Sequence, residues 1–349
     1  MADDRVGTLV IGGGQAGVSI GYFLRQAGED FRIVEAGTEI GASWRSRWDS
    51  LKLFTEARYN NLPGSRFPGD PERIPGKDDM ADYLRDYVRR FDLPVELGVE
   101  VGELSRTDGG YVAVAGDRQI LADRVVVATG PTGQPRVPAF ARDLAPAITQ
   151  VHSVDYRNPA LLPAGPALVV GAGNSGAEIA IELAAGRQVW LAGRDVGKFP
   201  FRLGSTVYRI MNRLLTTHTP MGRKIAARTG GGGTPLVRLR PEDITAARVR
   251  RVDRLDGVVG GQPKLVDGSV LEPTSIVWAT GFTRDYGWIK LPIFGETGDP
   301  IHDRGVVVGE PGLYFLGLPY LYSMASSLIM GVTKDAKYAA KMITAGPAG

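Results

Sequence analysis

The stretch Leu9-Val10-Ile11-Gly12-Gly13-Gly14-Gln15-Ala16-Gly17 decides the fold of this chain. Its glycines have the spacing G-x-G-x-x-G and lie between a short apolar run and an apolar, helix-like segment that extends to Ala27. In this motif the first glycine permits a tight turn, the second lets backbone approach a pyrophosphate, and the third lets a helix pack on a strand. A second apolar run, residues 31–34, ends at Glu35. The stretch therefore predicts a strand, a turn, a helix and a strand that bind a dinucleotide.

The same pattern occurs a second time, 171 − 12 = 159 residues later. Apolar residues 167–170 lead into Gly171-Ala172-Gly173-Asn174-Ser175-Gly176, then a helical pattern, then a run that ends at Leu191. Each half closes on an apolar strand followed by Ala-Thr-Gly, at residues 128–130 and 279–281. Two copies of one unit predict an α/β protein with two Rossmann-like dinucleotide-binding domains.

The first of these domains is expected to be discontinuous. After Gly312 the sequence contains a strand pattern, a proline turn and a helical pattern from about Ser323 to Ile343, which we expect to return to the first unit. Pro131, Pro135 and Pro138 follow the first Ala-Thr-Gly, and such proline-rich crossings are candidate hinges between the domains. The predicted division assigns residues 1–155 and 283–349 to the domain of the first loop and residues 156–282 to the domain of the second.

Composition limits the class of protein. The 349 residues suffice for two domains, and the net charge of +3 is spread along the chain without a basic run interleaved with aromatics, so we expect no nucleic-acid partner. Residues 312–332 lack charge, but their proline, glycines and hydroxyl side chains favour buried strand and turn over a membrane partner. The N-terminus does not resemble a signal peptide, so we expect a cytoplasmic protein. The absence of cysteine excludes electron relay through a cysteine pair.

The two units differ where a ribose is expected to lie. In the first, the second strand ends on Glu35, whose carboxylate would accept hydrogen bonds from ribose hydroxyls and repel a 2′-phosphate, as suits FAD or NAD. In the second, the strand leads to Arg194, whose guanidinium would pair with the 2′-phosphate of NADP. Lys198 and Arg202 are nearby candidates to share that role. The alternative for Arg194 is a solvated arginine at a strand end.

Several phrases outside the loops add a further signal: Gly41-Ala42-Ser43-Trp44-Arg45, Leu51-Lys52-Leu53, residues 63–68, Ala177-Glu178, Ala279-Thr280-Gly281-Phe282 and residues 311–317. With the two loops, these phrases resemble the class B flavin-dependent monooxygenases, nearest the flavin-containing monooxygenase and YUCCA branch, over essentially the whole chain. The resemblance implies FAD at the first loop, NADPH at the second and no metal. It places Trp44 over the flavin, with ordinary core packing as the alternative for this residue.

The candidate cofactor residues follow from the loops and from this resemblance. For FAD they are Gly12, Gly14, Gln15, Ala16, Gly17, Glu35, Trp44, Arg45, Val101, Thr129 and Gly130. For NADPH they are Gly171, Gly173, Asn174, Ser175, Gly176, Arg194, Thr280 and Gly281.

The family signature between the domains, F-x-G-x-x-x-H-x-x-x-Y/F, is present only in its second half, as His152 and Tyr156. We expect His152 to position the domains rather than to transfer a proton. The active-site asparagine found in many flavin-containing monooxygenases falls near residues 55–56 by register, with Asn60 and Asn61 a little later. Tyr59 and Asn61 are therefore the candidate catalytic residues on the substrate side of the flavin.

The resemblance implies that the protein takes O₂ and a small-molecule substrate and inserts one oxygen atom at a nitrogen, a sulfur or possibly a carbonyl, through a C4a-(hydro)peroxyflavin. The charge-free residues 320–330 would line an apolar substrate pocket. A disulfide reductase of the same plan would need cysteines, and none exist. An NAD(P)H:acceptor oxidoreductase or an oxidase without oxygen transfer stays open, as does a non-enzymatic redox sensor. The oligomeric state also stays open, with a homodimer among the possibilities.

Overall fold

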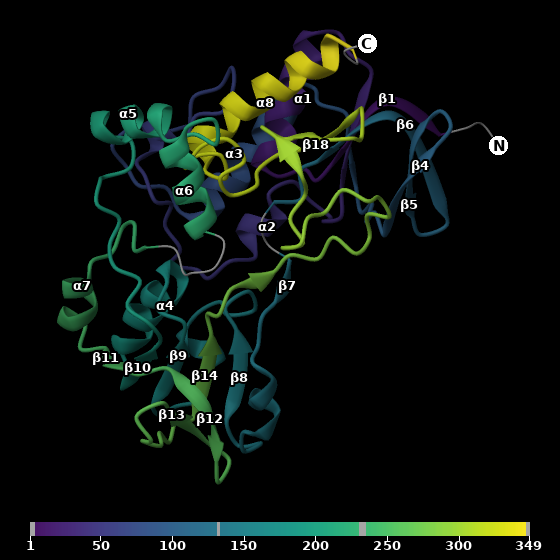
Figure 1. Ribbon diagram of the computed structural model, residues 1–349. Helices are drawn as coiled ribbons and strands as arrows, with labels where there is room; N and C mark the ends of the chain where they lie inside the picture. The colour runs from purple at the N-terminus through teal and green to yellow at the C-terminus, as the bar shows by residue number, and fades with distance from the viewer. Residues whose placement is uncertain (1–3, 131–132, 230–234, 347–349) are drawn as a thin grey trace.

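Two large sheets, each containing a strand that a glycine loop connects to a helix, organise the chain into an upper and a lower lobe (Figure 1). The computed structural model describes residues 4–130, 133–229 and 235–346. Both ends of the chain lie on the upper lobe (Figure 1). The α/β class predicted from the two glycine loops is confirmed, because both sheets have parallel strands at their centre.

The sheet of the upper lobe has the strand order β16-β17-β18-β6-β1-β2-β3, and a β4–β5 hairpin extends β6. Strand β1 is buried along most of its length, and the helices α1 and α8 pack against each other beside it. The strands are β1 (Arg5–Ile11), β2 (Phe31–Glu35), β3 (Val95–Leu97), β4 (Glu103–Thr107), β5 (Gly110–Ala115), β6 (Arg118–Val127), β16 (His302–Asp303), β17 (Val306–Val307) and β18 (Leu313–Phe315). The helices are α1 (Gln15–Gln26), α2 (Ala42–Arg45), α3 (Lys77–Arg90) and α8 (Ile329–Thr344), with a 3-10 turn at Ala57–Tyr59.

The sheet of the lower lobe is parallel, with the order β11-β10-β9-β14-β8. Strands β9, β10 and β14 are buried at every position, and apart from Ser275 their residues are apolar, as is typical of a sheet with both faces covered. The elements are β8 (Thr149–His152), β9 (Ala167–Val170), α4 (Asn174–Ala184), β10 (Val189–Ala192), α7 (Pro241–Ala246), β11 (Arg250–Val252), a β12–β13 hairpin (Leu255–Val259 and Gln262–Leu265) and β14 (Ser275–Trp278). Two 3-10 turns lie at Ala139–Asp143 and Pro159–Leu161.

Two short strands connect the lobes. Strand β7 (Gln134–Pro135) and strand β15 (Phe282–Thr283) pair in antiparallel fashion, so the two crossings of the chain lie side by side. Strand β8 pairs with β14, so Thr149–His152 belong to the lower sheet. The division predicted at residue 155 assigns these residues to the first domain. The assignment of each lobe to a cofactor stays a proposal.

The C-terminal segment returns to the first sheet, where β18 pairs in parallel with β6. The final helix begins at Ile329, six residues later than the sequence pattern suggested. Before it, the Ser326 hydroxyl accepts hydrogen bonds from the backbone N–H groups of Tyr322 and Ser323, which holds this stretch in a turn. Among the described residues, no helix is long and apolar enough to span a membrane.

The segment between β10 and α7 crosses to the upper lobe. Helices α5 (Thr206–Leu214) and α6 (Pro220–Thr229) lie beside the start of α8 in Figure 1. The Asn212 side chain accepts a hydrogen bond from the Ala325 N–H, and the Thr217 N–H donates to the Tyr322 carbonyl. The glycine run expected to form a loop, residues 230–233, lies outside the described residues.

Candidate functional site

The first glycine loop connects β1 to α1. Gly12 has φ +111°, and a Cβ there would lie 2.6 Å from the Ala128 carbonyl oxygen at the end of β6. A Cβ on Gly17 would overlap the Gly12 carbonyl oxygen. In contrast, a Cβ on Gly14 would meet no atom within 4 Å. Two glycines are therefore required by the packing of the chain itself, whereas the one between them faces open space.

The second loop, between β9 and α4, repeats this arrangement. Gly171 has φ +108°, and a Cβ there would overlap the Ala279 carbonyl oxygen at the end of β14. A Cβ on Gly176 would overlap the Gly171 carbonyl oxygen, and one on Gly173 would meet nothing within 4 Å. Both loops leave the same position free, which is where a nucleotide pyrophosphate approaches backbone in this motif.

Both helices that follow the loops begin without a capping side chain. Gly14 and Gly173 are the N-cap residues, and neither first turn contains an acidic residue. The N–H groups and the positive end of each helix are thus available to an anion. The residues present fit a dinucleotide at each loop.

Glu35 ends β2 beside the first loop. Its Oε2 accepts a hydrogen bond from the Gly13 N–H at 2.7 Å and its Oε1 accepts one from the Gly37 N–H at 2.9 Å. The Val99 N–H donates to the Glu35 carbonyl, which brings the β3–β4 connection containing Val101 close to this strand end. The carboxylate is therefore held at the loop before any ligand binds.

Trp44 lies on α2, between the packed interiors of the two lobes. Its indole Nε1 donates to the Gln15 side chain at 3.3 Å, so it reaches the first residue of α1. The neighbouring Arg45 guanidinium binds three carboxylates, Glu39 at 3.0 Å, Asp82 at 2.9 Å and Asp78 at 3.4 Å. Arg45 thus fastens α2 to α3, while the Trp44 ring is the part of this phrase nearest the loop.

The other predicted FAD residues surround the same loop. Ala16 is buried in the first turn of α1, and the Thr129 backbone nitrogen would lie 3.1 Å from a Cβ on Gly12. Thr129 is exposed, and Gly130 has φ +77° with open space around it.

Arg194 follows β10 at the edge of the second loop. Its side chain is exposed and forms no hydrogen bond or ion pair with any described residue. Arg202, by contrast, is paired with the buried carboxylate of Glu56 in the upper lobe. Arg251 on β11 donates to the Gly193 carbonyl at 3.1 Å, which places a second guanidinium beside Arg194. Sequence reasoning missed Arg251 because β11 joins β10 from 58 residues away.

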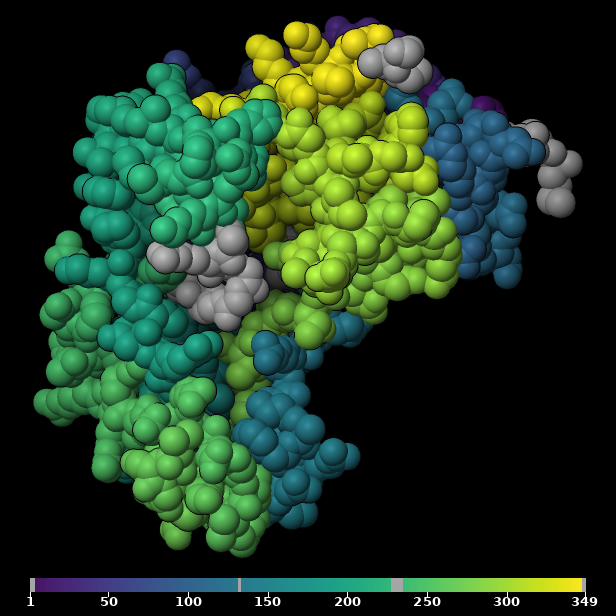
Figure 2. Space-filling model, viewed as in Figure 1, coloured from purple at the N-terminus to yellow at the C-terminus, as the bar shows by residue number. Residues whose placement is uncertain are grey.

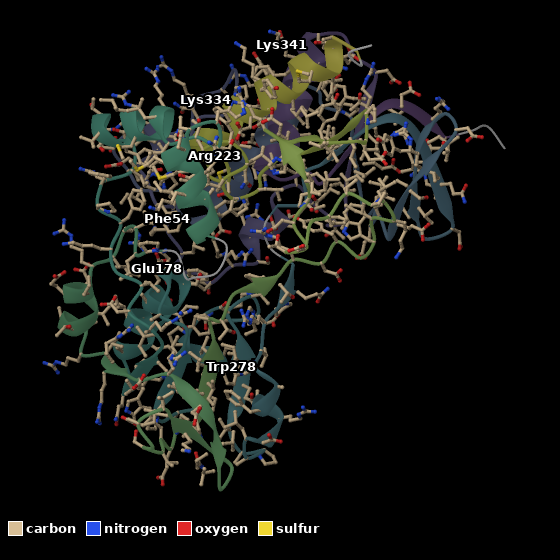
Figure 3. All side chains as sticks on the ribbon, viewed as in Figure 1. Phe54, Glu178, Arg223, Trp278, Lys334 and Lys341 are labelled. Atoms are coloured by element: carbon tan, nitrogen blue, oxygen red, sulfur yellow. The ribbon has the colours of Figure 1, made fainter. Side chains whose placement is uncertain are left out.

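A clasp holds the start of α4. The Asn174 side chain accepts from the Val237 N–H at 2.9 Å and donates to the Pro235 carbonyl at 3.1 Å. Arg238 pairs with Glu178 at 3.0 Å. Glu178 is buried, and this burial raises the pKa of its carboxyl. Figure 3 shows Glu178 near the junction of the lobes, below Phe54. Ser175 lies beside this contact in the first turn of α4.

The turn after β14 faces the linker. The Thr280 hydroxyl donates to the Arg136 carbonyl, and Gly281 has φ +80° with open space around it. The His152 Nε2 lies 3.1 Å from the Gly281 carbonyl oxygen, and its Nδ1 accepts from the Val154 N–H. Burial lowers the pKa of His152. Both ring nitrogens are occupied by backbone, which supports a positioning role. Tyr156 is buried, and its hydroxyl donates to Glu182 at 2.7 Å.

The structure separates the two candidate catalytic residues. Asn61 is exposed, and its amide donates to the Arg58 carbonyl and accepts from the Phe67 N–H, so it shapes the loop that contains it. Tyr59 packs its ring against Gly204, in the segment that crosses from the lower lobe. The neighbouring Asn60 is buried and bonded to Thr55 and Glu56. Of these two candidates, Tyr59 is thus the one whose ring contacts the segment that crosses between the lobes.

A cleft opens in the upper lobe between α6 and the yellow-green segment that precedes β18 (Figure 2). The yellow segment around the start of α8 lies at its floor (Figure 2). Tyr208 on α5 is buried against Leu203 and Ala325, together with the partly buried Met324, Leu328 and Met330. These apolar side chains pack α5 against residues 324–330. That residues 320–330 line a substrate pocket stays a prediction.

Comparison with known proteins identifies the family. The sequence profile of the family described as pyridine nucleotide-disulphide oxidoreductase matches residues 9–212. An uncharacterized oxidoreductase CzcO-like of Geobacillus kaustophilus is 40% identical over 341 residues, which cover 95% of this chain and 97% of that protein. The probable indole-3-pyruvate monooxygenase YUCCA3 of Arabidopsis thaliana is 26% identical, covering 94% of this chain and 86% of that protein.

Solved structures agree in fold. A flavin-containing monooxygenase from Stenotrophomonas maltophilia superposes with a TM-score of 0.78 at 28% identity and covers 98% of this chain and 99% of its own. The bacillithiol disulfide reductase of Staphylococcus aureus has a TM-score of 0.73 at 16% identity, covering 98% and 99%, and shows the fold alone.

The chain belongs to the pyridine nucleotide-disulphide oxidoreductase family, within which it lies with the class B flavin monooxygenases. It is a flavin-dependent oxidoreductase with the two-dinucleotide-binding fold, as the sequence predicted.

Proposed function

We propose that this protein is an FAD- and NADPH-dependent monooxygenase that inserts one oxygen atom from O₂ into a small, largely apolar molecule. The observation that carries the proposal is the pair of loops. They share one backbone arrangement, yet one is flanked by the Glu35 carboxylate, which accepts backbone hydrogen bonds, and the other by the Arg194 guanidinium, which has no partner among the described residues. Opposite charges at equivalent places suit a cofactor without a 2′-phosphate and one with it.

The residues toward FAD have separate tasks. The backbone N–H groups at the start of α1 would bind the pyrophosphate of FAD. The Glu35 carboxylate would accept hydrogen bonds from the ribose hydroxyls. Trp44, anchored by Gln15, would cover the ring system between the lobes. When bound, FAD supplies the electron transfer and the activation of O₂ that no side chain provides.

The residues toward NADPH come from three elements. The start of α4 would hold the pyrophosphate of NADPH, and Arg194 and Arg251 would bind its 2′-phosphate. The Thr280-Gly281 turn would contact the portion of NADPH that extends toward the upper lobe. His152 fastens that turn to β8 through its Nε2, which fixes the entrance between the lobes. The assignment of residues to FAD and NADPH domains follows from these tasks.

The segment with α5 and α6 restricts water at the reaction site. It extends from the lower lobe to the start of α8. Three contacts hold it there: the ion pair of Arg202 with Glu56, the packing of Gly204 against the Tyr59 ring, and the hydrogen bond between Asn212 and the Ala325 N–H. Glu56 is buried, so this ion pair is shielded on the carboxylate side. Excluding water favours oxygen transfer over release of peroxide. The small-molecule substrate would enter by the cleft in Figure 2.

A reductase that passes electrons through a cysteine pair is excluded, because the chain has no cysteine. The competing function is that of an oxidase or an acceptor reductase, which would use the same two cofactors. The cytoplasmic location expected from the sequence stays a prediction.

Oxygen transfer can be measured directly with labelled gas. The purified protein would be supplied with NADPH and ¹⁸O₂ and screened against amines, sulfides and ketones, with mass spectrometry of the products and a peroxide assay in parallel. A product that carries one ¹⁸O atom, with less peroxide than NADPH consumed, supports the proposal. Peroxide equal to NADPH with every compound would assign the oxidase function, and no NADPH consumption with any acceptor would contradict both.

A further inference from the structure

The segment between Asp195 and Glu242 differs from the rest of the chain in charge. It contains nine lysines and arginines and no aspartate or glutamate. Arg202 and Arg238 are used in ion pairs with Glu56 and Glu178, both buried. Arg209 and Arg213 on α5 and Lys224 on α6 have exposed side chains that form no ion pair within the described part of the chain. The helices of this segment therefore carry unpaired positive charge.

Helix α5 also exposes apolar side chains on one face. Val207, Ile210 and Leu214 are 49%, 51% and 59% exposed, and their spacing of three and four residues places them along one stripe. Met221, at the start of α6, is 64% exposed. A different face of α5 is already packed, since Tyr208 and Leu215 are buried and Asn212 binds Ala325. The apolar stripe of Val207, Ile210 and Leu214 thus stays exposed although α5 packs against the upper lobe.

Two alternatives for what covers the stripe differ in charge. A second copy related by a twofold axis would set the same surface against itself, so Arg209 and Arg213 would face their own equivalents. An anionic bilayer instead accepts apolar side chains into its interface and arginines at its headgroups. In Figure 2, the teal segment with α5 and α6 lies at the outer left edge of the upper lobe. Figure 3 shows Arg223 on α6, within this region.

We propose that α5 and the start of α6 form a peripheral membrane-binding surface that inserts Val207, Ile210, Leu214 and Met221 into the interface of an anionic phospholipid bilayer. Arg209, Arg213 and Lys224 bind the headgroups. This surface lies on the membrane without crossing it, which agrees with the absence of a spanning helix among the described residues. The proposal does not depend on the oxygenation reaction.

The test is co-sedimentation of the purified flavin-loaded protein with vesicles of phosphatidylcholine alone and of phosphatidylcholine with about one third phosphatidylglycerol. The triple variant Val207→Ser/Ile210→Ser/Leu214→Ser is expected to lower the partition coefficient for the anionic vesicles at least tenfold. The matched control is Leu161→Ser/Val259→Ser/Val308→Ser, whose side chains are 51%, 53% and 60% exposed elsewhere, and it is expected to bind as the wild type does.

The charge contribution has its own pair of variants. Arg209→Gln/Arg213→Gln is expected to weaken binding to the anionic vesicles by about fivefold per arginine, whereas Arg66→Gln/Arg89→Gln, also exposed, leaves binding unchanged. Flavin absorbance and the thermal midpoint report that each variant is folded. Equal binding of the two triple variants, or no sedimentation of the wild type with anionic vesicles, overturns the proposal. A dimer in sedimentation equilibrium that only the α5 triple variant disrupts would assign the stripe to a second copy and also overturn it.

Discussion

The two glycine loops have the same backbone and different surroundings. In each, the first and third glycines are enforced by carbonyl oxygens of the chain, and the middle one, Gly14 or Gly173, faces open space. Glu35 at the first loop already holds two backbone amides, whereas Arg194 at the second has no partner among the described residues. A group fixed before binding loses little conformational entropy, which favours a resident cofactor, while a free arginine suits one that exchanges in each cycle.

The loops also differ in what covers them. Trp44 reaches Gln15 from α2, within the same lobe. The start of α4 is instead clasped by residues 235–238, which follow the segment that crosses between the lobes. The second site is therefore fastened to the segment that crosses between the lobes, whereas the first is covered by Trp44, which packs against the interiors of both lobes.

The largest effect is expected from filling the open position in each loop. Gly14→Ala and Gly173→Ala add a Cβ that meets no protein atom, so both variants should fold. The Cβ occupies the space proposed for a pyrophosphate, which is expected to weaken binding by roughly 10- to 100-fold. Gly14→Ala should lose flavin absorbance on purification. Gly173→Ala should keep its flavin and show a higher KM for NADPH.

Gly186→Ala is the control for this pair, because a Cβ there also meets nothing within 4 Å and lies outside both loops. It should retain flavin and the wild-type KM. If Gly173→Ala loses flavin instead, the assignment of the loops is reversed.

The next effect concerns the choice between NADPH and NADH. Arg194→Gln removes the guanidinium proposed to bind the 2′-phosphate and is expected to lower the NADPH to NADH ratio of kcat/KM by about tenfold, the worth of one charge-assisted hydrogen bond. Arg251→Gln should lower it less, since that side chain is shared with the Gly193 carbonyl. Arg250→Gln, on the same strand, serves as control. An unchanged ratio in Arg194→Gln would remove this residue from the site.

A smaller effect is expected at the first loop. Glu35→Gln places an NH₂ group against one of the two backbone N–H donors that the carboxylate now satisfies. We expect the dissociation constant for FAD to rise about fivefold, which corresponds to ~1 kcal/mol. Equilibrium titration of the stripped protein with FAD measures this change. NADPH selectivity should stay as in the wild type, and a shift in it would show that the two sites are not independent.

The smallest effect is a pH dependence at the linker. Burial lowers the pKa of His152 in the folded protein below its ordinary 6.5, so its contribution to stability is present above that pH and is lost as the pH falls. The Tm of the wild type should fall between about pH 7.5 and pH 5.5, and by about 1–2 °C more than that of His152→Gln. Burial also lowers the pKa of His302, which is present in both proteins. The effect of His152 is therefore the difference between the Tm decrease of the wild type and that of His152→Gln. Equal decreases would mean that His152 does not titrate differently in the folded state.

Much of this arrangement could be predicted because it is local in sequence. The glycine spacing, Glu35 and the second strand of each unit lie within about 25 residues of one another, and the backbone of the motif follows from steric requirements alone. Contacts between distant segments were not accessible. Arg251 reaches Gly193, and Glu56 pairs with Arg202, only because the chain brings separate strands and lobes together.

The same reason explains why two candidate residues have protein partners that the sequence does not reveal. Arg45 reads as a flavin contact beside Trp44, but its guanidinium is taken by carboxylates on α3 and in the loop before α2. Asn61 follows the place that the family register gives, residues 55–56, and its amide closes a local turn with Arg58 and Phe67. In both cases the residue type fits the proposed chemistry, and hydrogen bonds that the sequence does not display use it elsewhere.

The central claim is that two different nucleotides occupy two separate loops of one chain. The most direct measurement is a calorimetric titration of the flavin-loaded wild type with NADP⁺ and then with NAD⁺, with the flavin spectrum recorded throughout. The account predicts one NADP⁺ per chain, bound more tightly than NAD⁺, with all of the flavin retained. Release of flavin as NADP⁺ binds would show that both nucleotides compete for one loop and would contradict it.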